Sequence, residues 1–170
     1  MAEAVNLQVV AKLIGAMSNA LDLTTPSDPL VLDFSTTFGN GTGASQANMW
    51  WHDQRTLGAS ATEDIDLAGS LTSVFGTTIT FTSIKMIYVK ASASNNVANN
   101  VNVSRASANG FVLFLAASDG FALPPGAFAL MVNPNATGWV VTAGTGDLLT
   151  LTNSAGTNSV VYDIVIVGEV

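Results

Sequence analysis

The one histidine of the chain lies in the segment Trp50-Trp51-His52-Asp53, where several residue types that can do chemistry stand together. A metal site on a β-barrel generally needs two or three histidines with a carboxylate, so His52 alone cannot supply one. Serines and aspartates are plentiful enough for a Ser-His-Asp triad, but no serine lies in a G-x-S-x-G motif. We therefore interpret His52 as a hydrogen-bonded strand or interface residue.

The two adjacent tryptophans would point to opposite faces of a strand. One of Trp50 and Trp51 is then expected in the core. The other is expected at the surface or at a subunit interface, where tryptophan is a common anchor. Aromatic platforms also bind sugars, so a carbohydrate-binding role stays open, with Trp139 as a weaker candidate of the same kind.

The acidic residues form one cluster, Glu63, Asp64 and Asp66. Alternating carboxylates can hold Ca²⁺, but this spacing matches no EF-hand loop and lacks the glycine of its turn. A solvated strand or loop is the better interpretation. The glycine-rich segment 39–43 has no Lys-Ser/Thr after it and is no phosphate loop. The sequence thus predicts no catalytic, cofactor-binding or metal-binding residue.

Charge is scarce in this chain. Apolar residues make up 48% of it and charged residues 10%, against about 25% in an average globular protein. The surface must therefore consist largely of Ser, Thr, Asn, Gly and Ala, or be covered by partners. We expect both.

The net charge is −7, and the five lysines and arginines are scattered. Nucleic acid and anionic membranes are bound by clustered cations, so neither is an expected partner. The chain has no cysteine, which excludes disulfides and thiolate metal sites. Without a basic leader or an apolar run of about 18 residues, it is expected to be made in a cytoplasm.

The first segment has the spacing of an amphipathic helix. Within 6–22 the apolar residues recur at intervals of three and four: Val10, Leu13, Ile14, Met17 and Leu21. Pro26 and Pro29 would end such a helix. We therefore predict an N-terminal helical segment or arm over 1–28 and place Val10, Leu13 and Met17 among the candidate interface residues, together with Trp50, Trp51 and His52.

From residue 29 to 170 the pattern is that of β-structure. The candidate strands are short and rich in Val, Ile, Thr and Phe: 30–34, 48–54, 61–67, 77–82, 84–90, 101–104, 110–115, 127–132, 139–142, 148–152 and 160–167. Roughly ten short strands with no helical pattern between them are typical of a sandwich or barrel. The strand at 160–167 is apolar on both faces, which favours a central strand or one covered by a partner.

The order of elements from Asp66 to Val170 resembles small virion proteins of tailed bacteriophages. It is carried by the segments 66–81 and 84–90, Asn109-Gly110-Phe111, 123–130 with its Leu-Pro-Pro-Gly start, 139–153 and 161–168. The proteins they resemble are chiefly capsid decoration, or cement, proteins. None of these segments is a catalytic signature, so no catalytic residue carries over.

The resemblance implies a jelly-roll-like antiparallel β-sandwich, here with a short N-terminal α-helix. It also implies a non-enzymatic role: binding to the outer surface of a virion head and stabilising contacts of the major capsid protein, often as a homo-oligomer, with a trimer favoured. A neck, tail or spike component remains an alternative in the same class. A carbohydrate- or receptor-binding sandwich is an alternative from a different class.

Overall fold

The computed structural model describes residues 4–170, and all regular secondary structure in that range is β. The strands are β1 Leu7–Ser18, β2 Ser27–Asn40, β3 Gln46–Ala47, β4 Met49–Leu57, β5 Thr62–Asp66, β6 Ala68–Thr72 and β7 Thr78–Thr80. They continue with β8 Ser83–Ala91, β9 Val101–Arg105, β10 Gly120–Leu123, β11 Phe128–Val132, β12 Trp139–Val140, β13 Leu148–Asn153 and β14 Val160–Glu169. The prediction of a mainly β, antiparallel protein is confirmed.

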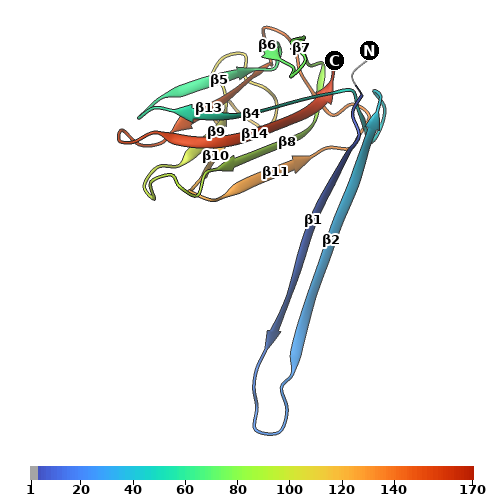
Figure 1. The fold of residues 1–170 in the computed structure, drawn as a ribbon, viewed down its shortest axis with the longest axis vertical. Coiled ribbons are helices and arrows are strands. Elements are labelled where there is room, and N and C mark those ends of the chain that lie inside the picture. The colour runs from blue at the N-terminus through green and yellow to red at the C-terminus, as the bar shows by residue number, and fades with distance from the viewer. Residues whose placement is uncertain (1–3) are drawn as a thin grey trace.

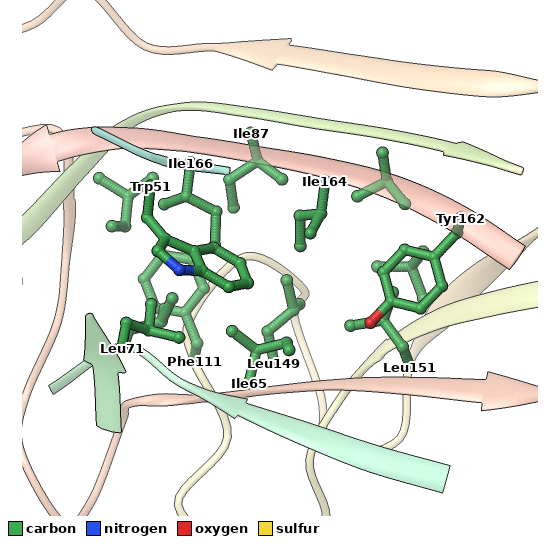
Figure 2. Packing of buried hydrophobic residues seen from close by; sticks show 14 of the residues in the cluster. Trp51, Ile65, Leu71, Ile87, Phe111, Leu149, Leu151, Tyr162, Ile164 and Ile166 are labelled. Atoms are coloured by element: carbon green, nitrogen blue, oxygen red, sulfur yellow. The ribbon is translucent and has the colours of Figure 1, made fainter. Parts of the chain in front are cut away.

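Eight of these strands form two four-stranded antiparallel sheets. One sheet has the order β11-β8-β14-β4, with β12 continuing the β11 edge of β8, and we name it the arm-side sheet. The other has the order β10-β9-β13-β5, and we name it the far sheet. Their inner faces enclose one apolar cluster, in which Ile164 of β14 and Leu149 of β13 are fully buried (Figure 2).

Strand β14 is the central strand that its sequence predicts, because β8 and β4 pair with it on either side. Tyr162, Ile164 and Ile166 point into the core. Val165 and Val167, on the other face, belong to a second, smaller cluster. A segment of the same chain covers part of this second face, around Met86 and Val167.

That segment is a long hairpin, β1 and β2, which projects away from the sandwich (Figure 1). The two strands pair over their whole shared length, from Leu7 opposite Phe38 to Ser18 opposite Ser27. We name β1, β2 and the turn 19–26 between them the arm. Only the end of β2 has a further strand beside it, because β3 pairs in parallel with Gly39 and Asn40.

The arm corrects the prediction of an N-terminal helix over 6–22. Spacing of three and four residues also arises when both faces of a strand carry apolar side chains, as Val10 and Leu13 do here. Pairing with residues 27–38 decides between helix and strand, because their backbone forms the hydrogen bonds that β1 needs as a strand. Residues 1–3 of the predicted segment lie outside the described residues.

The candidate strand 110–115 is wrong as well, because these residues run as a loop at the end of the far sheet. The Arg105 guanidinium group donates to the carbonyl oxygens of Gly110, Phe114 and Leu115 at 3.1, 3.2 and 3.3 Å. A side chain thus satisfies carbonyls that a ladder would otherwise bond. The sequence prediction missed β10, which pairs with β9 instead.

Candidate functional site

The two faces of the arm differ in chemistry. Residues directly opposite in an antiparallel pair share a face, so the register assigns every side chain. One face is almost entirely apolar over its free length and carries Ala11, Leu13, Met17, Leu30, Leu32 and Phe34. The large side chains of this apolar arm face are half to three-quarters exposed, from Phe34 at 45% to Met17 at 75%. A patch of this kind marks an interaction surface.

The opposite face of the arm is mixed. Val10, Ile14 and Val31 lie exposed there beside an ion pair, Lys12 Nζ to Asp33 Oδ2 at 3.4 Å. Both charged side chains are about half exposed, so the pair contributes little to stability. It does keep this face compatible with water, which leaves the first face as the one that needs a partner.

At its base, the apolar arm face is buried against the arm-side sheet. Val9 and Phe38 continue that face toward the sandwich and pack, with Val5, on Met86 and Val167. Phe38 is fully buried. The root of the arm, residues 5–9 with Phe38, is therefore part of the folded domain, whereas the free part extends beyond it (Figure 1).

The turn at the tip of the arm combines polar residues with two exposed leucines, Leu21 and Leu23. Two backbone bonds close it, Asn19 N to the oxygen of Pro26 at 3.2 Å and Leu21 N to the oxygen of Thr24 at 2.9 Å. Leu23 between them is 99% exposed. This leucine extends the exposed apolar surface to the end of the arm.

A buried ion pair supports the sandwich near the root. Lys85 of β8 is fully buried, and its Nζ lies 3.0 Å from Glu169 Oε1. The same ammonium group donates to the carbonyl oxygens of Asn135 and Ala136 at 2.6 and 2.5 Å, in the loop between β11 and β12. Ser45 beside the arm root donates its backbone N–H to Pro134 of that loop at 2.7 Å. The loop thus joins the ion pair to the arm.

The six candidate interface residues lie in four different environments. Leu13 and Met17 lie on the apolar arm face and Val10 on the mixed face, all three exposed. The expected alternation of the tryptophans is confirmed: Trp51 is 7% exposed in the core and Trp50 is 41% exposed on the outer face. His52 lies exposed on that outer face, opposite Val165. Arm and sheet residues are thus on separate surfaces.

Sequence analysis missed the second strand of the arm as part of the interaction surface. Leu30, Leu32 and Phe34 share the apolar arm face with Leu13 and Met17. The available signal was the alternation in Leu30-Val31-Leu32-Asp33-Phe34. A strand pattern directly after Pro26 and Pro29 would have suggested a hairpin partner for the preceding residues.

The acidic cluster is used in side-chain bonds. Glu63 accepts from Arg55 Nε at 2.9 Å and from the Tyr162 hydroxyl at 2.5 Å. Asp64 accepts from the Thr150 hydroxyl, and Asp66 accepts from the backbone N–H of Ala68. Within residues 4–170 no group of three or more His, Asp or Glu side chains is placed to hold a metal ion. No described helix is long and apolar enough to cross a membrane.

Tyr162 gives the protein an alkaline limit. Burial, and then its hydrogen bond to Glu63, raise the pKa of this phenol far above its usual range. Above about pH 10 the unfolded chain releases this proton while the folded chain keeps it, so the free energy of unfolding falls as the pH rises, by about 1.4 kcal/mol per pH unit. Urea unfolding from pH 9 to 11 measures the slope. Tyr162→Phe should flatten it, whereas Tyr88→Phe, which retains Tyr162, should not.

The outer face of the far sheet carries two adjoining hollows of about 350 and 340 Å³. Both are lined by Ser104 and Ser118, the first also by Asn102 and Thr152 and the second by Thr150. Their walls are rich in hydroxyl groups. Neither Trp50 nor Trp139 lines them, and Phe121 is the aromatic residue in the lining of the first hollow.

Comparisons with known proteins add no family. No family model matches the sequence. No curated protein matches it significantly.

Proposed function

We propose that this protein is a structural virion protein of a tailed bacteriophage, a capsid decoration protein. It would bind the outer surface of the head and stabilise contacts of the major capsid protein. The observation that carries this proposal is the arm: a rigidly rooted hairpin whose free part exposes one apolar face. A two-stranded ribbon is marginally stable alone in water, so its free part is built to lie against another protein.

The strand order supports the jelly-roll part of this proposal. Without the short strands β6, β7 and β12, the eight sandwich strands can be counted along the chain from β4 to β14. In this count the spatial order of strands is 6-3-8-1 in the arm-side sheet and 5-4-7-2 in the far sheet. Two Greek keys wound from eight strands produce this order. Jelly rolls are frequent in capsid proteins, which is an argument by analogy.

The low charge supports an assembly role as well. The chain has 10% charged residues, and the arm exposes large apolar side chains such as Leu13 and Met17, a combination typical of surfaces that are covered by partners. Partner proteins that cover the arm would remove these apolar side chains from water.

A shortened arm tests the proposal. Residues 12–33 are replaced by Asn-Gly, which joins the register partners Ala11 and Phe34 by a two-residue turn and keeps the root. In co-sedimentation with heads that lack the protein, we expect the full chain to bind in hundreds of copies and the shortened chain at least about tenfold more weakly. Val97→Ser, at an exposed loop residue away from the arm, is the control and should bind fully.

Equal binding of the shortened chain would remove the arm from the account and overturn the proposal. Binding of a few copies at the neck or tail would favour the alternative of a neck, tail or spike component. Both outcomes can be read from copy number and from electron-microscopy density of the decorated particle.

The hydroxyl-lined hollows favour a second candidate function, a carbohydrate-binding sandwich. Their volumes, about 350 and 340 Å³, lie at the lower end of the range for small-molecule sites. A glycan array tests this candidate with the full chain. A bound glycan that is lost with Ser104→Trp, which fills both hollows, but retained when the arm is shortened would support it.

A further inference from the structure

The outer face of the arm-side sheet carries an apolar stripe that is exposed at its two ends and half-buried in the middle, where it packs against the arm root. Its outward-facing side chains form three rows across the strands, as the pairing register gives them. The stripe crosses these rows diagonally from β11 to β4 and consists of Phe128, Leu130, Tyr88, Val165 and Trp50. Phe128 and Trp50, at its two ends, are 62% and 41% exposed. The rings of Tyr88 and Phe128 are in contact, with centroids 6.0 Å apart and planes tilted by 36°.

We propose that the apolar arm face of one copy docks on this stripe of a second copy of the same chain. Within one chain the two surfaces do not meet, because the arm projects away from the sheet beyond its root (Figure 1). The root already uses the same arm face to pack on the same sheet face, at Met86 and Val167. The intermolecular contact extends this packing. It rests on the arm being an assembly element, as proposed above.

The dimensions of the two surfaces agree. From Ala11 to Met17 the arm face runs roughly 20 Å at about 3.4 Å per residue. The stripe crosses three strand spacings of about 4.8 Å and is offset by four residues along the strands, which also gives roughly 20 Å. The two surfaces can therefore be aligned end to end, with Met17 over Phe128 at one end and Phe34 near Trp50 at the other.

The charges agree with this orientation. Asp28, opposite Met17, is the charged residue of the apolar arm face. Lys90, which lies between Phe128 on β11 and Asp163 on β14, is the lysine among the outward-facing residues of the arm-side sheet. With Met17 over Phe128, these two charges come together at the rim of the contact. An oppositely charged pair at a rim fixes the register of docking more than its affinity.

The area is that of a reversible contact. Over the roughly 20 Å that the two surfaces share, an arm face about 10 Å wide covers roughly 200 Å². In a reciprocal exchange two arms dock on two sheets and bury roughly 800 Å² in total, which is the size of weak, transient interfaces. A larger closed ring uses the same contact once per neighbouring pair.

Cross-linking tests the contact, because the chain has no cysteine of its own. Met17→Cys and Phe128→Cys replace exposed side chains and are purified separately, one of them with a mass tag, then mixed and treated with a short bis-maleimide. We expect a cross-linked pair containing one copy of each variant, and sedimentation of the untreated full chain as a dimer or larger ring. Val97→Cys mixed with Met17→Cys is the control and should give no such product.

The charge pair gives an independent readout. Asp28→Lys and Lys90→Asp should each raise the dissociation constant of self-association about three- to tenfold, and the two together should restore it. Cross-links only between two Met17→Cys copies would mean that arms pair with arms and would overturn the inference. A monomer that still binds heads through its arm would also overturn it, while leaving the proposed function standing.

Discussion

Lys85→Ala is expected to lower the free energy of unfolding by about 3–5 kcal/mol, the cost of breaking a buried ion pair from one side. The substitution leaves the Glu169 carboxylate without its cation, in a site where Lys85 is fully buried. It also leaves the carbonyl oxygens of Asn135 and Ala136 without their donor. The total free energy of unfolding of a domain is about 5–15 kcal/mol. The loss expected for Lys85→Ala is therefore one of the largest that a single substitution can cause here.

The exposed pair Lys12–Asp33 provides the matched control. Lys12→Ala removes a cation from a half-exposed pair and should cost less than about 1 kcal/mol. Urea unfolding followed by tryptophan fluorescence measures both variants. The double variant Lys85→Met with Glu169→Gln should recover part of the loss, because it leaves no unpaired charge and keeps an acceptor for Ser83. Equal losses for Lys85→Ala and Lys12→Ala would contradict the importance of the buried pair.

Phe38→Ala and Phe34→Ala should separate folding from assembly on the same arm face. Phe38 is fully buried in the root cluster with Val9 and Val167, so its truncation leaves a cavity and should cost about 3–5 kcal/mol of stability. Phe34 is 45% exposed, and its truncation should change stability by less than about 1 kcal/mol. It should, however, weaken self-association or binding to heads about tenfold or more, since it removes an aromatic anchor.

Chemical unfolding and co-sedimentation with heads, each run on both variants, give the comparison. If Phe34→Ala destabilises the free chain as much as Phe38→Ala, the free part of the arm is a folding element and has no separate role. If Phe34→Ala binds and associates like the unchanged chain, the apolar arm face is not the contact surface.

Most strands could be predicted from local sequence patterns. Ten of the eleven candidate segments correspond to strands, among them β4, β8, β13 and β14, because period-two alternation and turn residues act locally. The opposite directions of Trp50 and Trp51 follow from the same alternation. The segment 110–115 failed because Arg105, which precedes it, bonds its carbonyl groups.

The candidate site was predictable in composition but not in shape. The sequence predicts Val10, Leu13 and Met17 as interface residues, but on a helix, where the three side chains would share one face. As β1, the segment places Leu13 and Met17 on one face and Val10 on the other. Helix and strand differ here by the pairing of β1 with β2, a contact between residues distant along the chain, which local spacing does not encode.

The sequence by itself determined that this chain is mainly β, carries little charge and has an apolar N-terminal segment. The tertiary structure alone decided that this segment is a hairpin arm, that its root and Lys85 are buried, and that its free face lies outside the fold. The physical reason is that alternation and composition act within a few residues. Which apolar face is buried, and which is left for another molecule, depends on strand pairing across the whole chain.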